Sequence, residues 1–386
     1  GKEVKMRNKL IPLILTGVLL IALISCGGGK GGDNEPNNTI DQASKITLAQ
    51  PFSTKITPVG DNDWFKVEIP EQGYLKVQAS NIPEEIGLEV AFALYQEWEG
   101  EKIKYIREWH RVPDAVFIPK AGTYYFVIKD DYDDKESKNP IEMKVDFLKE
   151  FDPNEPNNKP EDAKLVQLNS VINPAIYPTG DQDWLKVKVE KQGYLLLKSK
   201  NVPEDIVPQI KYTIYDEWSE PKIKEIKDWH HIPDSCSVIN TGEYYILLHD
   251  DFDDRSSETT FELKIDFLEE MDQYEPNDNF KDAKSVNRGD TLKLAIFPKG
   301  DYDYFKIKLE EENKIKFMAK DFASNIVPEI RIYILNPENP NKLTKVIDWK
   351  RCPVEFELEV DKDYFFLVHD DYDDRSSPKL FELKIE

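Results

Sequence analysis

The sequence predicts an all-β protein built from three tandem β-sandwich domains, and two observations lead to this fold class. First, the chain of 386 residues repeats with a period of 120, because the stretch GDNDWF at Gly60 returns as GDQDWL at Gly180 and as GDYDYF at Gly300. Second, apolar and polar residues alternate in short runs, and no segment keeps a helical period. Solenoid units are only about 20–50 residues long, so a period of this length indicates whole domains.

Three further landmarks keep the same period, so the repeat covers the chain beyond its N-terminus. They are Glu35, Glu155 and Glu275, then Trp109, Trp229 and Trp349, then Asp130, Asp250 and Asp370. We therefore expect domains at 33–150, 151–270 and 271–386, with boundaries near Phe151 and Met271. The junctions FLKEFDPNEPNN and FLEEMDQYEPND contain no long spacer, which predicts that neighbouring domains touch.

The strands of the first repeat follow from alternating apolar residues. Residues 65–69 alternate, the stretch EQG turns the chain, and residues 75–79 alternate again, which predicts a hairpin. Residues 123–130 and 141–148 predict a second pair across an acidic loop. Further strands are expected at LEVAFALY and KIKYIREW, and TIDQASKI is expected to form one helical turn at most. About seven or eight short strands per repeat fit a β-sandwich.

The N-terminus has the pattern of an export signal rather than of a folded element. Met6 is the expected start, Arg7 and Lys9 form a basic region, and residues 10–25 are apolar but short for a membrane span. The stretch LISC, which ends at Cys26, resembles the lipobox of bacterial lipoproteins. The alternative is an ordinary signal peptide that contains a cysteine.

The lipobox resemblance has consequences for processing and location. It implies that residues 1–25 are an upstream extension and a signal peptide, and that residues 26–32 are a lipidated Cys26 followed by a glycine-rich tether. The protein would then be anchored by lipid to a membrane of the bacterial cell envelope, facing the periplasm or the cell exterior.

Charge and motifs exclude several classes of function. The net charge of −23 repels nucleic acid and favours cations or basic partners. The sequence has no G-x-S-x-G and no HExxH motif, so a hydrolase of these types is excluded. Cys236 and Cys352 occupy non-equivalent repeat positions, so we interpret both as buried or idle thiols rather than as a disulfide framework or a metal site.

Three motifs together resemble the bacterial pre-peptidase C-terminal domain family. They are NEPNN at Asn34 followed by Ala43, then GDNDWF, then GTYYFVI near the end of the repeat, and all three repeats carry them, over residues 34–386. The family includes the collagen-binding modules of clostridial collagenases. The resemblance implies a jelly-roll-like β-sandwich, found mostly as an accessory module of secreted peptidases. No peptidase domain accompanies the modules in this sequence.

The resemblance also implies calcium sites, because in the collagenase modules the matching residues help to bind calcium. The matching positions are Glu35, Asn37, Asp61 and Asp63, then Glu155, Asn157, Asp181 and Asp183, then Glu275, Asn277, Asp301 and Asp303. Calcium takes six to eight oxygen ligands of mixed type, which suits this set. The alternative is turn chemistry, in which Asp and Asn cap the backbone. We favour calcium, because clustered carboxylates in an acidic chain need a counter-charge.

Two other features are candidates for contacts. The acidic loops DDYDD, DDFDD and DDYDD that begin at Asp130, Asp250 and Asp370 could hold a cation, but we favour a solvated loop with Arg255 and Arg375 as partners. Trp98 and Trp218 lie among polar residues in the first two repeats and are candidate ligand contacts, or else they fold over a sheet edge. Trp109 and Trp229 are expected in the core, as are Trp64, Trp184 and Tyr304.

Together these features predict a non-catalytic surface lipoprotein made of tandem, calcium-stabilised binding modules. Its role would be adhesion, or binding of an extracellular protein or polysaccharide. The alternative is a structural spacer, or an accessory factor that docks a partner secreted peptidase in the cell envelope.

Overall fold

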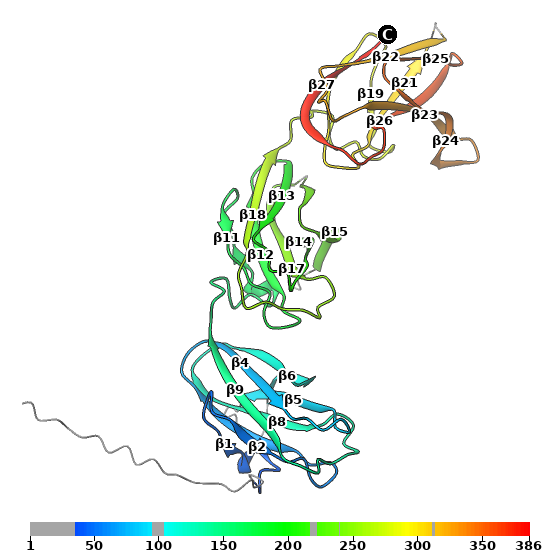
Figure 1. Cartoon of the computed structure of the whole chain (residues 1–386). Coiled ribbons are helices and arrows are strands. Elements are labelled where there is room, and N and C mark those ends of the chain that lie inside the picture. The colour runs from blue at the N-terminus through cyan, green and yellow to red at the C-terminus, as the bar shows by residue number, and fades with distance from the viewer. Residues whose placement is uncertain (1–34, 95–103, 217–221, 239, 311–312) are drawn as a thin grey trace, which may run out of the picture.

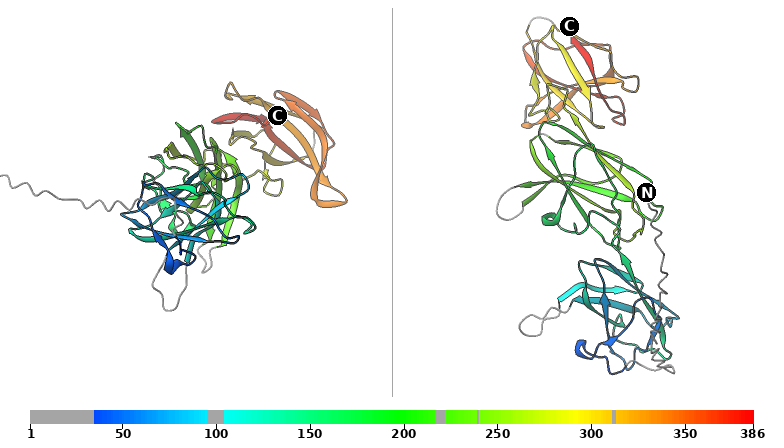
Figure 2. Two further views of the ribbon diagram at one scale, coloured as in Figure 1. Left: turned by 60° about the horizontal axis from the view of Figure 1, so that its bottom comes forward. Right: turned by 90° about the vertical axis from the view of Figure 1, so that its left-hand side faces the viewer.

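The computed structural model describes residues 35–94, 104–216, 222–238, 240–310 and 313–386. Three all-β domains follow one another end to end in an elongated, gently curved arrangement (Figures 1 and 2). Cys26, Trp98 and Trp218 lie outside the described residues. Within the described part of the chain, no helix has the length and apolarity needed to cross a membrane.

Each domain contains nine described strands. Domain 1 has the 3₁₀ turn η1 (Ile40–Gln42) and the strands β1 (Ser44–Lys45), β2 (Phe52–Thr54), β3 (Asp63–Ile69), β4 (Gly73–Ser80), β5 (Leu88–Leu94), β6 (Lys104–Arg111), β7 (Asp114–Ile118), β8 (Gly122–Asp130) and β9 (Ile141–Lys149). Domain 2 has η2 (Pro160–Asp162), β10 (Lys164–Leu165), β11 (Val171–Ile172), β12 (Asp183–Val189), β13 (Gly193–Lys200), β14 (Pro208–Asp216), β15 (Lys222–His231), β16 (Asp234–Val238), β17 (Gly242–Asp250) and β18 (Glu262–Glu269). Domain 3 has β19 (Lys284–Ser285), β20 (Thr291–Ile296), β21 (Asp303–Leu309), β22 (Lys314–Lys320), β23 (Pro328–Asn336), β24 (Asn339–Arg351), β25 (Val354–Glu357), β26 (Lys362–Asp370) and β27 (Ser377–Ile385).

The strand order is that of a jelly roll. In domain 1 one sheet has the order β1-β3-β8-β5-β6 and the other has the order β2-β9-β4-β7. Without the short parallel edge strand β1, the eight strands β2 to β9 form the two four-stranded sheets of a double Greek key. Domains 2 and 3 repeat this order with β10–β18 and β19–β27. The predicted fold class, three tandem jelly-roll-like β-sandwiches, is confirmed.

The core of each domain lies between its two sheets. In domain 1, Phe65 on β3, Leu75 on β4 and Phe126 on β8 are fully buried. The rings of Phe65 and Phe126 stack with centroids 5.3 Å apart, and the corresponding rings of domain 3, Phe305 and Phe366, lie 5.2 Å apart. Every domain therefore has its own apolar core, because the inward positions of the alternating strands all point between the sheets.

Both predicted hairpins are wrong in the same way. β3 pairs with β8 and β4 pairs with β9, so the EQG turn between β3 and β4 crosses from one sheet to the other. The acidic loop after β8 likewise leads to β9 in the opposite sheet. Alternation shows only that one face of each strand is buried. Two consecutive strands with this pattern can therefore be neighbours in one sheet or can face each other across the core. The strand number also exceeds the expectation, since the two-residue strands carry no pattern of their own.

The junctions between domains are packed. Tyr74 of domain 1 packs edge-on against Tyr177 of domain 2, with ring centroids 4.8 Å apart, and Phe151 of the connecting segment contacts both. The Tyr74 hydroxyl donates to Glu150, 3.0 Å away. The second junction repeats the aromatic pair, with Tyr194 and Phe297 at 4.8 Å. Apolar contact at both junctions favours a fixed orientation between neighbouring domains.

Candidate metal centre

In each domain the segment before the first strand meets the start of the third strand at one point. The backbone N–H of Trp64 donates to the carbonyl of Asn37 at 2.8 Å, and the same bond joins Trp184 to Asn157 and Tyr304 to Asn277. This bond brings the EPN segment against the Gly-Asp-x-Asp turn. The carboxylates that the sequence places more than twenty residues apart are thereby brought together.

Turn chemistry accounts for part of this arrangement. One oxygen of Asp181 accepts the Tyr177 N–H at 3.0 Å, and one oxygen of Glu155 accepts the Asn157 N–H at 3.0 Å. These bonds fix the two turns, as Asp and Glu commonly do. The other oxygen of Asp181 accepts the Gln182 N–H at 3.0 Å, but a carboxylate oxygen has two lone pairs, so one capping bond leaves a lone pair for a cation.

Carboxylate oxygens converge in every domain. One oxygen from each member of the set lies within 4.8 Å of the others, and the sets are Glu35, Asp61 and Asp63; Glu155, Asp181 and Asp183; and Glu275, Asp278 and Asp301. The second set is buried throughout. Three carboxylates at such separations repel one another strongly in a low-dielectric interior unless protons or a cation intervene.

The asparagine of each set supplies an independent observation. Asn37, Asn157 and Asn277 are completely buried, and the Oδ1 atom of each has no hydrogen-bond partner among the described residues. In domains 2 and 3 the Nδ2 of the same amide donates to Asp183 at 2.7 Å and to Asp303 at 3.1 Å. In these two domains the amide is therefore oriented. In all three domains the Oδ1 lone pairs are removed from water and gain no hydrogen bond from the described residues in exchange. Carboxylate and amide oxygens together form a ligand set that suits calcium.

Burial and mutual repulsion raise the pKa values of these acids. Burial raises the pKa of Asp63 to about 7, with the charges of Asp61 and Glu35 adding to the effect against the hydrogen bond from Thr54. Burial likewise raises the pKa of Glu155 and of Glu275 to about 8. The pKa of Asp183 lies well above its usual range, because it is fully buried and Asp181 lies beside it. A divalent cation would reverse these shifts by favouring the ionised forms.

The structure adds carboxylates that the sequence reasoning missed. Asp278 belongs to the third set, where the repeat position otherwise holds Asn38 or Asn158. Asp152 and Asp272 are buried beside the second and third sets, where each accepts a backbone N–H and raises the pKa of the neighbouring acids. Two features of the sequence could have indicated these acids. Asp278 is the last residue of YEPND, which replaces NEPNN, and Asp152 and Asp272 each stand three residues before an EPN motif.

The second set borders the first junction. A cavity of about 270 Å³ lies there, lined by residues of domain 1 such as Arg107 and by Asn158, Gly180 and Asp181 of domain 2. Arg107 is held by Asp114 at 2.9 Å and by the carbonyl of Thr179 at 3.0 Å. The cavity offers water and ions a route to Asp181.

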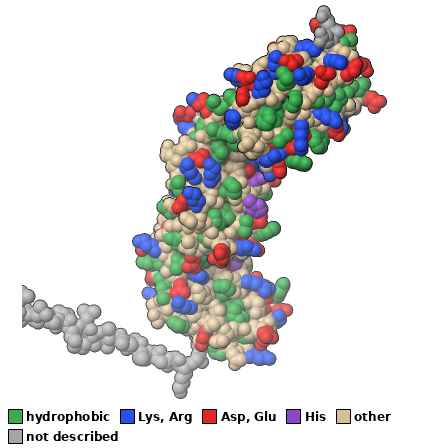
Figure 3. Space-filling model, turned by 45° about the horizontal axis from the view of Figure 1, so that its top comes forward, with side chains coloured by type: hydrophobic (Ala, Val, Ile, Leu, Met, Phe, Trp, Pro, Cys, Tyr) green, Lys and Arg blue, Asp and Glu red, His purple; other side chains and the backbone are tan. Residues whose placement is uncertain are grey.

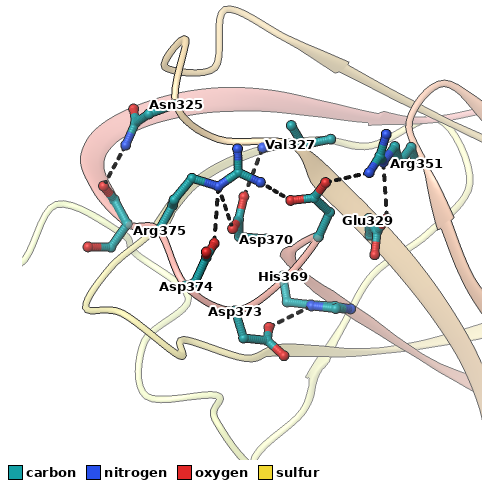
Figure 4. Close-up of polar contacts among 11 residues, drawn as sticks. Asn325, Val327, Glu329, Arg351, His369, Asp370, Asp373, Asp374 and Arg375 are labelled. Atoms are coloured by element: carbon teal, nitrogen blue, oxygen red, sulfur yellow. Dashed lines mark hydrogen bonds and ion pairs between the residues drawn. The ribbon is translucent and has the colours of Figure 1, made fainter.

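The acidic loops after β8, β17 and β26 are neither hairpin loops nor fully solvated. Asp370 is buried and accepts the Val327 N–H at 2.9 Å, and Arg375 approaches the second oxygen of Asp370 at 3.2 Å (Figure 4). Arg351 lies 2.6 Å from Asp371 and 3.4 Å from the buried Glu329. The predicted arginine partners are thus present, since Arg255 also lies 3.7 Å from Asp254. These loops carry their own counter-charges, unlike the EPN clusters.

The remaining residue predictions have mixed outcomes. Trp64 and Trp184 are buried, but under the N-terminal segment of each domain rather than between the sheets. Tyr304 and Trp109 are half-buried, and Trp229 is 41% exposed, so the core assignments of these three are wrong. β15, which carries Trp229, is an edge strand of its sheet, and the Trp229 ring packs against the His249 ring at 3.9 Å. Cys236 and Cys352 are free thiols, and Cys236 is buried.

Comparisons with known proteins identify no family for this chain of three jelly rolls and three acidic clusters. No protein-family model matches it, and no curated protein matches it. Among solved structures, an archaeal virus protein with a triple jelly-roll fold is 11% identical, with a TM-score of 0.17, and the match covers 88% of each chain. Tripeptidyl peptidase 2 is 9% identical, with a TM-score of 0.21, and the match covers 88% of this chain and 32% of that one.

A third similar structure holds the M60 catalytic domain of Clostridium perfringens ZmpB with two CBM51 domains. It is 10% identical, with a TM-score of 0.16, and the match covers 88% of this chain and 38% of that one. This chain thus spans about a third of the length of the two larger proteins. At such TM-scores no role of these proteins is transferred to this chain.

Proposed function

We propose that the protein is a non-catalytic rod of three calcium-stabilised binding modules that works at the bacterial cell envelope. The observation that carries the proposal is the threefold occurrence of one cluster, in which carboxylates converge beside a buried asparagine oxygen that lacks a partner among the described residues. The resemblance of the EPN and Gly-Asp-x-Asp motifs to the pre-peptidase C-terminal family supports calcium as the cation.

The position of the clusters supports a structural task for the cation. Each cluster ties the entry of a domain to its third strand, and the second lies next to the junction formed by Tyr74 and Tyr177. An ion there would stabilise the domain, because its ligands come from the entry segment and from the turn before the third strand, and it would thereby fix the entry segment beside the junction. Domains that are stiffened in this way suit a protein that holds binding surfaces away from a membrane.

Several features speak for binding rather than catalysis. The cluster recurs in nearly the same form three times, whereas an active site normally combines different groups in one cleft. In the second set Glu155 and Asp181 each accept a backbone N–H, and Asp183 accepts the Asn157 amide. Such groups are held for coordination and have little freedom to approach a substrate.

Location at a membrane is the part of the proposal that depends on Cys26. We expect the wild-type protein, expressed in a bacterial host, to partition into the detergent phase, and the Cys26→Ala variant to partition into the aqueous phase, because the variant lacks the acylated thiol. Phase partitioning followed by immunoblotting measures this. Equal partitioning of the two proteins would contradict the lipid anchor.

The binding role is tested with an array of glycans and matrix proteins, probed with the labelled Cys26→Ala chain in calcium and in chelator. We expect a restricted set of ligands, bound more tightly in calcium. A chain that binds no ligand under either condition would instead act as a spacer, an alternative that the packed junctions also support. Equal binding in both conditions would contradict the calcium dependence.

A further inference from the structure

We propose that the three acidic loops form a multivalent docking surface for a cationic polypeptide, in which an exposed aromatic ring at each loop receives lysine or arginine side chains. The inference deepens the proposed binding function, on which it rests, by naming the class of partner. It is carried by the aromatic rings and not by the acidic residues alone.

The exposed rings are the first observation. Tyr132, Phe252 and Tyr372 are 75%, 76% and 68% exposed, and no other large apolar side chain in the described part of the chain is more exposed than 59%. All three occupy one repeat position, between the two Asp-Asp pairs of DDYDD, DDFDD and DDYDD. An isolated exposed ring needs no explanation, but the same ring exposed at the same place in three domains does.

The loops hold the backbone that carries these rings in a fixed turn. In each loop the backbone N–H of the third aspartate donates to the carbonyl of the first and closes a turn. In domain 1 this bond joins Asp133 to Asp130 at 3.2 Å, and Asp133 has a φ of 53°. Asp130 accepts the N–H groups of Gly87, Asp134 and Lys135. The corresponding turns at Asp253 and Asp373 have a φ of 55°. The backbone that carries each ring therefore has little conformational freedom to lose on binding.

A second aromatic residue adjoins each of the first two loops. Lys129 lies over the Trp109 ring at 4.6 Å and pairs with Asp133 at 3.0 Å. In domain 2, His249 contacts Trp229 at 3.9 Å and Asp253 at 2.7 Å. The half-exposed tryptophan and the exposed loop ring thus belong to one surface, and domain 1 already places a lysine ammonium over one of its rings.

Charge selects a cation as the occupant. The four aspartates of each loop outnumber the cations beside them: Lys135, Lys129 and Arg111 leave a net charge of −1 at the first loop, Arg255 leaves −3 at the second, and Arg375 and Arg351 leave −2 at the third. Aromatic faces attract ammonium and guanidinium groups, and nearby carboxylates strengthen the attraction. On the face of the molecule in Figure 3, acidic and basic side chains are interspersed.

Three such sites on one chain make a flexible cationic polymer the best-suited ligand. Each ring with its carboxylates is a weak site, but a ligand long enough to reach two or three of them gains affinity through its raised effective concentration. A short lysine peptide should therefore bind far more weakly than a long one. This length dependence distinguishes docking along the rod from a single local site.

The experiment measures the affinity of fluorescein-labelled oligolysine for the full chain by fluorescence anisotropy at physiological ionic strength. We expect the variant Tyr132→Ser, Phe252→Ser, Tyr372→Ser to bind at least about tenfold more weakly, since three linked contacts are lost together. The variant Tyr132→Phe, Tyr372→Phe should bind like wild type, because it keeps the ring faces. The variant Asp134→Asn, Asp254→Asn, Asp374→Asn should bind more weakly and depend less on salt.

A matched control removes three exposed apolar side chains away from the loops, in the variant Leu165→Ser, Val171→Ser, Met271→Ser, and should leave binding unchanged. Equal affinity of the ring variant and wild type would overturn the proposal, since attraction to the acidic surface alone would then explain binding. Ring-dependent self-association in sedimentation, or ring-dependent binding of a neutral glycan without oligolysine binding, would overturn it as well. None of these outcomes depends on a calcium-induced stability change, so the two proposals fail separately.

Discussion

Calcium should raise the melting temperature of the chelated chain by on the order of 5–10 °C. A ligand that binds only the folded state stabilises it by RT ln(1 + [L]/Kd), which is about 2.7 kcal/mol at a hundredfold excess over Kd. For a domain of about 120 residues this corresponds to a shift of that size. Magnesium should produce a much smaller shift, because it requires a regular octahedron of short bonds. Differential scanning calorimetry in calcium, in magnesium and in chelator measures the difference.

A double substitution in domain 2 assigns the effect to the cluster. In the variant Asp181→Asn, Asp183→Asn we expect domain 2 to lose its calcium-dependent shift, whereas domains 1 and 3 retain theirs. Its stability in chelator should not fall, because the mutual repulsion of buried carboxylates is relieved. The control Glu204→Gln, Asp205→Asn removes two exposed acids of the same domain and should respond to calcium like wild type. Identical melting of wild type in calcium and in chelator would leave turn chemistry as the only role of the motif.

The calcium affinity should increase steeply between pH 5 and pH 8. The pKa values of about 7 for Asp63 and about 8 for Glu155 and Glu275 mean that these acids are protonated in the cation-free folded state at pH 5. Calcium must displace those protons, so its affinity changes by about tenfold per pH unit for each proton released. Titration calorimetry at several pH values measures this dependence, and an affinity that does not change with pH would contradict it.

The same shifts give the cation-free chain the opposite pH dependence. A carboxyl group whose pKa is higher in the folded state binds more protons there than in the unfolded state between the two pKa values. Its contribution to stability is therefore fully present below about pH 4, the unfolded value, and is lost as the pH rises toward 7 or 8. In chelator the melting temperature should fall from pH 5 to pH 8, whereas in saturating calcium it should fall much less.

Much of the fold could be predicted from the sequence because the repeat and the alternation are local signals. The strands around Phe65, Leu75 and Phe126 were readable from their buried faces, and the period of 120 showed three domains. Strand pairing was not readable, because β3 and β4 present the same pattern whether they lie side by side or face each other. The exposure of Trp229 was missed for a related reason, since composition does not show which strand lies at the edge of a sheet.

The candidate site was predictable to a similar extent. The EPN and Gly-Asp-x-Asp motifs named eight of the nine converging carboxylates, since their spacing repeats in triplicate, but in the third set Asp278 converges where Asp303 was expected. Asp152 and Asp272 were not found, because an acid in a connecting segment resembles any solvated residue until its burial is known. The exposed rings of the acidic loops were overlooked because exposure, like burial, depends on which side of a turn the chain presents to solvent.

The number of calcium ions bound by the chain tests the central claim most directly. Isothermal titration at pH 8 should give three equivalents for the wild-type chain and two for the variant Asp181→Asn, Asp183→Asn, because each domain holds one cluster of converging carboxylates. Binding of three equivalents by both proteins would place the ions elsewhere, for example in the acidic loops. A wild-type chain that binds no calcium would contradict the account outright.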